Sequence, residues 1–230
     1  MSAPKGKAKV IVSKNGPYLV SGGVPLAKQT IVADAAGASQ DWRESDPFPA
    51  QDSYALCRCG HSATKPFCDG SHTRVRFNGT ETASHEPYVR QAQLMEGPTL
   101  DLADAESLCA FARFCDRDGQ VWNQVAHTDD AHLRAPFVRQ VNQCPSGRLT
   151  ALEHGTARAH EPALPVSIGV VEDPAQECSG PLWLRGGIPV ESAHGFNYEL
   201  RNRVTLCRCG ASKNKPFCDG SHAAIKFRDY

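Results

Sequence analysis

Two short segments of this sequence carry closely spaced cysteines followed by a histidine, a combination of residue types that binds metals. The segments read CRCGHSATKPFCDGSH over residues 57–72 and CRCGASKNKPFCDGSH over residues 207–222. Thirteen of the sixteen positions are identical. Each segment offers three thiolates and one imidazole, which are ligands of zinc and of iron–sulfur clusters. The expected metal ligands are Cys57, Cys59, Cys68, His72, Cys207, Cys209, Cys218 and His222.

The spacing within each segment divides its four ligands into two pairs. Cys57 and Cys59 are separated by one residue, and Cys68 and His72 are one helical turn apart if Pro66 begins a helix. Each pair can therefore bind one metal atom, as a [2Fe–2S] cluster requires. A structural Cys₃His zinc site uses the same ligand types and is the alternative. Zinc sites usually space their cysteines as C-x₂₋₄-C, so the tighter C-x-C spacing favours the iron–sulfur cluster.

Both segments resemble the CDGSH iron–sulfur family, whose pattern is C-x-C-x₂-[ST]-x₃-P-x-C-D-G-[SAT]-H. Every fixed position of the pattern is present twice, including Ser62 and Ser212. The resemblance implies a redox-active, acid-labile [2Fe–2S] cluster in each segment, with the first two cysteines on one iron and cysteine plus a solvent-near histidine on the other. Family members with one motif form two-fold dimers. We therefore expect the two copies to pair within this chain as a pseudo-dimer.

The histidine ligands make the predicted clusters sensitive to charge and pH. Replacing one of four thiolates by a neutral imidazole makes the oxidised cluster less negative, which raises its reduction potential. An imidazole must be neutral to bind iron, so protonation competes with the metal. We expect His72 and His222 to couple reduction and cluster release to pH.

Three further cysteines lie between the two motifs, at Cys109, Cys115 and Cys144. They follow the C-x₂-C-x₂-C frame of cluster-binding ferredoxins with its distant C-P, except that Ala112 stands at the central cysteine. Residues 94–152 resemble the divergent mono-cluster ferredoxin domain, which implies a third cluster. Three thiolates suit a [3Fe–4S] cluster, and a [4Fe–4S] cluster would need another ligand, such as Asp116 or water. The alternative is three ordinary buried cysteines in a degenerate domain.

The elements that position these ligands are expected to be short. Upstream of each motif, an apolar segment, a Gly-Gly turn and another apolar segment predict strand–turn–strand over residues 18–26 and 182–190. In the insert, the spacing of apolar residues predicts helices over residues 101–114 and 131–142. Residues 27–53 are rich in Ala, Asp and Pro and are expected to form a loop.

These elements predict an α+β protein of three small domains. Residues 1–90 and 161–230 would form two β-rich CDGSH iron–sulfur modules in tandem. Residues 91–160 would form an inserted, divergent mono-cluster ferredoxin-like α+β domain. The composition is 40% hydrophobic and only 7% aromatic, which is typical of small domains stabilised by bound metal.

Composition and charge argue against several classes of function. The 25 basic and 25 acidic residues balance, so the chain lacks the positive field that attracts nucleic acid. No apolar run reaches the roughly 18 residues of a membrane span, and the first twenty residues do not have the apolar region of a signal peptide. We expect a cytoplasmic protein, where clustered cysteines bind metals rather than form disulfides.

The expected function is electron transfer or redox sensing with a partner protein. Cluster delivery to an apo-acceptor is one alternative, and a zinc-stapled interaction module is another. The sequence contains no nucleophile–base arrangement or phosphate loop, so we do not expect an enzyme. We expect a monomer in which the two motifs pair internally, and we expect Cys178 to be a small buried apolar residue without a role.

Overall fold

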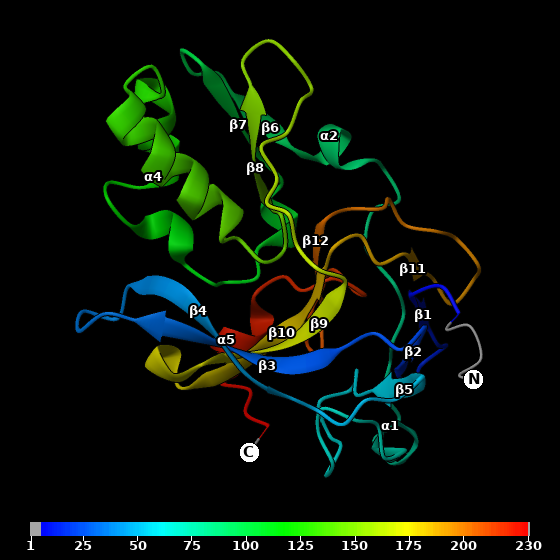
Figure 1. Ribbon diagram of the computed structural model, residues 1–230. Helices are drawn as coiled ribbons and strands as arrows, with labels where there is room; N and C mark the ends of the chain where they lie inside the picture. The colour runs from blue at the N-terminus through cyan, green and yellow to red at the C-terminus, as the bar shows by residue number, and fades with distance from the viewer. Residues whose placement is uncertain (1–5, 230) are drawn as a thin grey trace, which may run out of the picture.

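The two duplicated segments build two β-sheets, and each sheet takes strands from both halves of the chain (Figure 1). The computed structural model describes residues 6–229. The sheets have the strand orders β11-β1-β2-β5 and β12-β10-β9-β3-β4. Their strands are β1 Lys9–Val12, β2 Tyr18–Ser21, β3 Leu26–Ala33, β4 Ser39–Pro47, β5 Ser53–Leu56, β9 Ser167–Asp173, β10 Cys178–Arg185, β11 Val190–Glu191 and β12 Arg203–Leu206.

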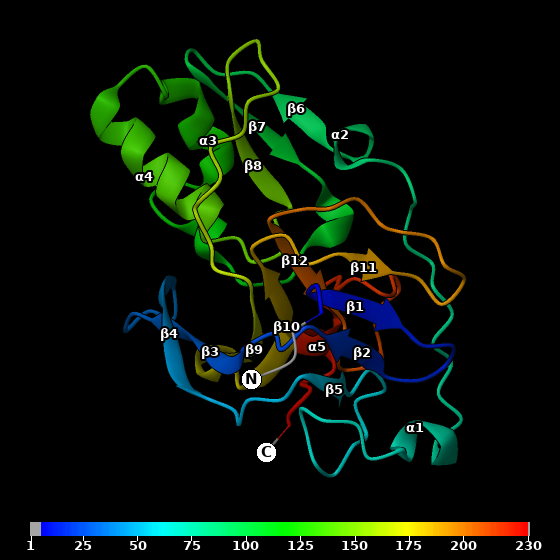
Figure 2. The same cartoon turned by 45° about the vertical axis from the view of Figure 1, so that its right-hand side comes forward.

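The halves of the chain exchange strands: the second half gives β11 to the first sheet, and the first half gives β3 and β4 to the second. β11 pairs in parallel with β1, with Val190 opposite Val10. In the same way, β3 pairs in parallel with β9, with Leu26 opposite Ile168. The apolar segments that flank each Gly-Gly turn are therefore strands, as predicted, but they do not pair with each other. Each second strand crosses to the sheet of the other half, as β11 beside β1 shows in Figure 2.

The glycine turns that precede the crossing strands admit no side chain. Gly22 has φ +89°, and a Cβ there would lie 2.6 Å from the backbone nitrogen of Ala8. Gly186 has φ +75°, and its Cβ would lie 2.7 Å from the carbonyl oxygen of Leu164. Glycine tolerates this left-handed conformation and the close approach of backbone. The duplicated glycines thus redirect the chain at equivalent points of the two halves.

One hydrophobic core serves both halves. Its buried residues come from strands and turns of each half, so that apolar side chains of one half are covered by those of the other. The core comprises Val10, Val12, Tyr18, Val20, Val24, Leu26, Leu56, Ile168, Val170, Leu182, Leu184, Ile188, Val190, Tyr198, Val204 and Leu206. This shared core supports the expected intrachain pseudo-dimer.

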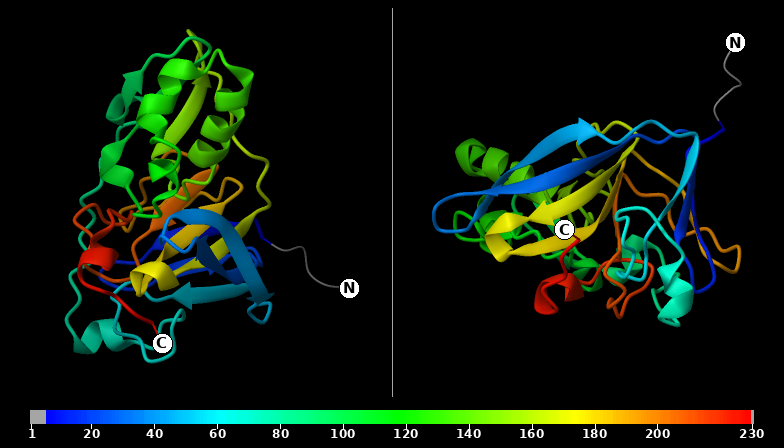
Figure 3. Two further views of the ribbon diagram at one scale, coloured as in Figure 1. Left: turned by 90° about the vertical axis from the view of Figure 1, so that its left-hand side faces the viewer. Right: turned by 90° about the horizontal axis from the view of Figure 1, so that it is seen from below.

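The segment between the duplicated halves forms a separate layer above the two sheets (Figure 3). Three antiparallel strands, β6 Gln93–Met95, β7 Leu100–Asp104 and β8 Leu149–Glu153, form its sheet. The helix α4 Ala131–Asn142 packs on this sheet through Phe137 and Val141. Its bounds confirm the helix predicted over residues 131–142, and Asp130 caps it by accepting a hydrogen bond from the backbone N–H of His132.

The helix expected over residues 101–114 was wrong. β7 covers the first part, and all five of its residues are buried, a pattern that apolar spacing alone confuses with a helix. Two 3₁₀ turns follow, η1 Glu106–Leu108 and η2 Phe114–Asp116. Between them, Phe111 and Arg113 have φ of +54° and +60°, which a right-handed helix does not allow.

The loop expected over residues 27–53 was also wrong. β3 and β4 fill most of it as a hairpin, closed by the carboxylate of Asp34, which accepts hydrogen bonds from the backbone of Ala36 and Ala38. Polar composition hid the alternation of buried and exposed residues along β3.

The remaining helices are short. They are α1 Ser71–Arg74, α2 Tyr88–Gln91, α3 Val121–Gln124, α5 Ser221–Ala224, η3 Val125–His127 and η4 Pro174–Gln176. Within residues 6–229, no helix has the length and apolar character needed to cross a membrane.

Candidate metal centres

The structure brings the four predicted ligands of the N-terminal motif together as two pairs. Cys57 follows β5 directly, and its Sγ lies 3.8 Å from Sγ of Cys59. Sγ of Cys68 lies 3.4 Å from Nδ1 of His72, which stands in the first turn of α1. Both cysteines of the first pair are buried, whereas the second pair is half-buried. The cysteine–histidine side of this site therefore faces solvent.

Hydrogen bonds within the motif hold the loop around these ligands. The carboxylate of Asp69 accepts from the backbone N–H of Ala63 at 2.8 Å and of Ser71 at 2.9 Å, and these bonds hold its pKa well below the usual range. The hydroxyl of Ser62 donates to the carbonyl oxygen of Phe67 at 2.6 Å. The helix predicted from Pro66 was wrong, because this loop continues to Gly70 and α1 begins only at Ser71.

The C-terminal motif repeats this geometry. Sγ of Cys207 lies 3.7 Å from Sγ of Cys209, and Sγ of Cys218 lies 3.4 Å from Nδ1 of His222. The carboxylate of Asp219 accepts from the backbone of Lys213 and Ser221, as Asp69 does in the first copy. Among residues 6–229, no three His, Cys, Asp or Glu side chains are grouped so that they could hold one metal ion.

Backbone N–H groups also point at the ligand sulfurs. The N–H of His61 lies 3.4 Å from Sγ of Cys59, and the N–H groups of Gly70 and Gly220 approach Cys68 and Cys218 at 3.5 and 3.4 Å. Such donors stabilise the negative charge of a coordinated thiolate and thereby affect the potential of a cluster.

The two sites lie back to back. Cys59 and Cys209 face each other in an isolated antiparallel bridge. A Cβ on Gly60 would lie 2.5 Å from the carbonyl oxygen of Cys209, and a Cβ on Gly210 would lie 2.5 Å from that of Cys59. Only glycine permits this reciprocal contact. The symmetric pair of glycines is the local mark of the pseudo-two-fold relation between the copies.

Ligand thiols differ in how readily they ionise. Burial raises the pKa of Cys59 to about 11 and raises that of Cys115 as well. In the C-terminal pair, the hydrogen bond with Cys209 lowers the pKa of Cys207 to about 6. The same contact raises the pKa of Cys209, so one proton is shared within this pair, and metal binding must displace the protons of thiols whose pKa is raised.

The three cysteines of the insert converge on one pocket, which Cys109, Cys115 and Cys144 line together. They come from the end of η1, from η2 and from the turn after α4. Ala112 lies in the same wall, at the place of the absent central cysteine. Asp116, the suggested extra ligand, has Oδ1 3.8 Å from Sγ of Cys115.

Cys178 does not join this group. It is buried at the start of β10, as expected, and is not among the residues that line the pocket.

Two residues that position the ligand cysteines were not predicted from the sequence. The hydroxyl of Tyr18 donates to the carbonyl oxygens of Cys207 at 2.7 Å and of Pro216 at 3.0 Å, so the first half orders the second ligand loop. The buried guanidinium of Arg203 donates to the carbonyl oxygen of Cys144 at 2.8 Å. The repeat could not reveal Tyr18, because Leu182 stands at the equivalent position of the second copy.

The family models agree with this arrangement. A model described as an iron-binding zinc finger of CDGSH type matches residues 15–73 and again residues 179–223. The chain contains two CDGSH-type iron-binding domains. Between the two CDGSH matches, a model described as a divergent 4Fe-4S mono-cluster domain matches residues 95–154, which contain all three cysteines of the central pocket. No curated protein and no solved structure matches this CDGSH protein.

Proposed function

We propose that this CDGSH protein transfers electrons, or senses redox state, through two [2Fe–2S] clusters and one central cluster. The pairing of ligands carries the proposal. Each motif offers two sulfurs 3.7–3.8 Å apart and a sulfur–imidazole pair 3.4 Å apart, which gives each iron of a two-iron core its own pair. A single tetrahedral zinc ion would need all four ligands around one point. The half-buried, converging cysteines of the insert suit a [3Fe–4S] cluster, or a [4Fe–4S] cluster with a further ligand.

The ligand set also favours redox chemistry. Three thiolates and one neutral imidazole leave an oxidised [2Fe–2S] centre with less negative charge than four thiolates do, so an electron is accepted more readily. The half-exposed His72 gives solvent protons access to one ligand, which supports a cluster whose reduction and release depend on pH.

Spectroscopy on anaerobically purified protein tests the proposal. We expect iron and sulfide without stoichiometric zinc, reduced [2Fe–2S] signals in electron paramagnetic resonance (EPR), and an oxidised [3Fe–4S] signal from the centre. Cys57→Ser and Cys207→Ser should each remove one [2Fe–2S] signal, and Cys178→Ser is the matched control that should remove none. A colourless protein that contains only zinc would refute the proposal and support the zinc-stapled module.

Cluster delivery is a second candidate, favoured by the solvent-facing Cys68 and His72 of the N-terminal site. Incubation with an apo-ferredoxin at neutral pH tests it, because delivery moves iron and sulfide to the acceptor whereas electron transfer does not.

The proposal also covers the cellular compartment, the partners and the oligomeric state of the protein. We infer a cytoplasmic protein that is not an enzyme, that acts with a redox partner protein or an apo-acceptor and that needs no second copy of itself. All ten cysteines are free thiols, which suits a reducing compartment. The internal pairing of Cys59 with Cys209 supplies the contact for which a one-motif chain would need a dimer.

A further inference from the structure

The two duplicated sites differ in what covers them. In the C-terminal site, Cys218 and His222 are 2% and 4% exposed, whereas their counterparts Cys68 and His72 are half-buried. The ligand geometry is the same, so the difference arises from the segments packed outside each site.

The cover of the C-terminal site is the cysteine-bearing loop of the insert. A Cβ on Gly220 would lie 3.4 Å from the carbonyl oxygen of Cys109 and 3.4 Å from Cβ of Phe111. The side chain of Asn214 donates to the carbonyl oxygen of Ser107 at 2.8 Å. The backbone that carries one ligand of the central pocket thus lies directly against the loop that carries Cys218.

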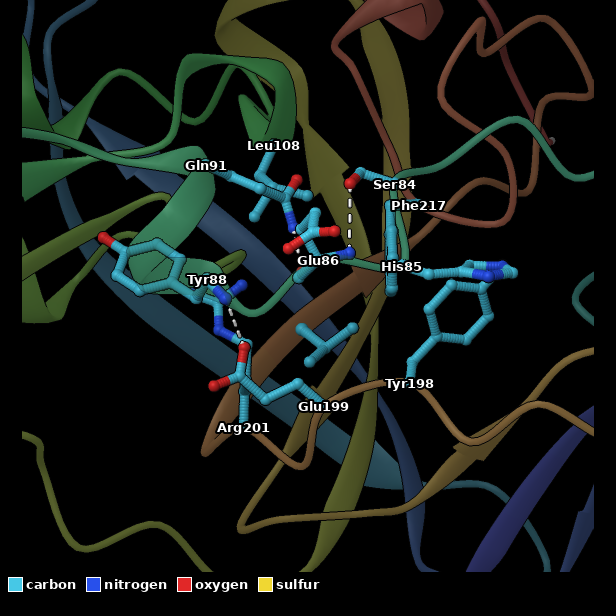
Figure 4. A pocket seen from close by; sticks show the side chains of 11 residues that line it. Ser84, His85, Glu86, Tyr88, Gln91, Leu108, Tyr198, Glu199, Arg201 and Phe217 are labelled. Carbon is cyan, nitrogen blue, oxygen red and sulfur yellow. Dashed lines mark hydrogen bonds between the residues drawn. The ribbon is translucent and has the colours of Figure 1, made fainter.

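Leu108 and Phe217 meet beside this contact. Each residue immediately precedes a ligand cysteine, and both line the same small pocket, beside Tyr88 (Figure 4). Phe217 packs against the buried cluster that contains Leu108 and Tyr88. The two ligand-bearing segments therefore approach each other through packed side chains.

A second contact joins the same two sites through β12. Arg203 donates from Nη1 to the carbonyl oxygen of Cys144, and Arg201 donates to that of Gly147. β12 then continues into Cys207. The turn with the third central cysteine is thus anchored to the strand that leads into the C-terminal site.

The N-terminal site adjoins the C-terminal one. Its contact with the rest of the ligand sets is the bridge between Cys59 and Cys209. Figures 1 and 3 place α1, which carries His72, at the far end of the molecule from the insert, whereas α5 lies nearer to it. The three sites are therefore ordered as central, C-terminal and N-terminal.

The equivalent arginines of the two motifs, Arg58 and Arg208, differ in whether an acidic side chain neutralises their charge. Arg208 forms ion pairs with Glu172 and with Asp229. In the part of the chain that the structure describes, Arg58 forms no ion pair; it donates to the carbonyl oxygens of Ser13 and Gly79. Both guanidinium groups are buried. A buried positive charge without a counter-ion attracts an added electron more strongly than a neutralised one does.

From these contacts we propose, on the basis of the proposed function, that the protein passes electrons in one direction through its three sites, with the buried C-terminal site as the intermediate carrier. One electron from a low-potential one-electron donor enters at the central site, passes to the C-terminal site and ends at the N-terminal site. With clusters bound, each transfer would oxidise one site by one electron and reduce the next site by one electron. The open N-terminal site then reduces the external acceptor protein.

EPR on the anaerobic protein tests this order. His72→Cys and His222→Cys keep four ligands and mark each [2Fe–2S] signal by altering its g values, so that the two signals can be assigned. Photochemical reduction leaves the central [3Fe–4S] cluster oxidised in part of the sample. The paramagnetic central cluster should make the C-terminal signal saturate at a higher microwave power than the N-terminal signal. Cys144→Ser, which removes a central ligand, should abolish that difference, and Cys178→Ser should leave it unchanged.

The order of reduction is the second readout. With less than one electron per chain, the N-terminal signal should appear before the C-terminal signal, and Glu172→Gln with Asp229→Asn should reduce this preference. Equal saturation of the two signals, with all three clusters present, would overturn the relay. Earlier reduction of the C-terminal cluster would overturn its direction. Absence of any iron–sulfur signal would instead refute the proposed function, so the two failures are distinguishable.

Discussion

Replacing Arg203 by methionine should loosen the central site and leave the two CDGSH sites in place. The guanidinium is fully buried and makes five hydrogen bonds: two to the carboxylate of Glu161 and one each to the carbonyl oxygens of Val141, Cys144 and Leu149. Methionine retains most of the packing volume but removes all five hydrogen bonds, and Glu161 keeps the side chain of Asn202 as a donor. Removing one partner of a buried ion pair destabilises a protein by about 3–5 kcal/mol.

Urea unfolding of the cluster-loaded protein measures this effect. With a slope of about 2 kcal/mol per molar, a loss of about 4 kcal/mol lowers the midpoint by about 2 M. Arg158→Met is the matched control, because Arg158 and Glu153 form an exposed pair worth less than about 1 kcal/mol. The variant should also lose the central EPR signal before either [2Fe–2S] signal. If Arg203→Met unfolds at the same urea concentration as the control and retains the central cluster, the account of this anchor is wrong.

Three further changes test other parts of the structure. Acidification from pH 7 to pH 5 should release the N-terminal cluster first. Burial lowers the pKa of His222 to about 4 and keeps it neutral, whereas the half-exposed His72 is accessible to protons from solvent. Simultaneous loss of absorbance and of both marked EPR signals would contradict this order of release. Ala112→Cys should supply the absent ligand and replace an oxidised [3Fe–4S] signal by a [4Fe–4S] cluster; an unchanged signal would count against the pocket geometry. The hydrogen bond of His154 with Asp101 raises the pKa of His154, so its contribution to stability is present below the ordinary histidine pKa and is lost as the pH rises through the folded value. The urea midpoint of the natural protein should therefore fall toward that of His154→Gln between pH 6 and pH 8, and a constant difference would exclude the interaction.

The ligand pairs could be predicted because the hydrogen bonds that shape them are local. Asp69 binds backbone groups only six and two residues away, and Asp219 repeats this in the second copy. A motif that carries its own folding interactions has much the same geometry wherever it occurs. The convergence of the central cysteines was predictable for a similar reason, since two of them lie close together on either side of Ala112.

The pairing of strands could not be predicted in this way. Strand propensity indicates that residues 18–21 and 26–33 are extended, but it is the same whether they pair with each other or with the other half. Only long-range packing decides between these arrangements, through contacts such as Val10 opposite Val190. The covering of His222 by the loop around Phe111 is likewise a property of how the insert sits on the sheets, and no residue near His222 in the sequence encodes it.

The crossing of β3 and β11 has a consequence for how the protein is made. β1, β2 and β5 leave the ribosome early, but the outer strand of their sheet, Val190–Glu191, is translated more than a hundred residues later. Until then Gly60 has no Cys209 to lie against, and the thiols at 57 and 59 lack half of their surroundings. The surroundings of the first-synthesised site are therefore complete only after residue 209 has been translated. Neither duplicated half, expressed alone, has a complete sheet in which to hold its metal.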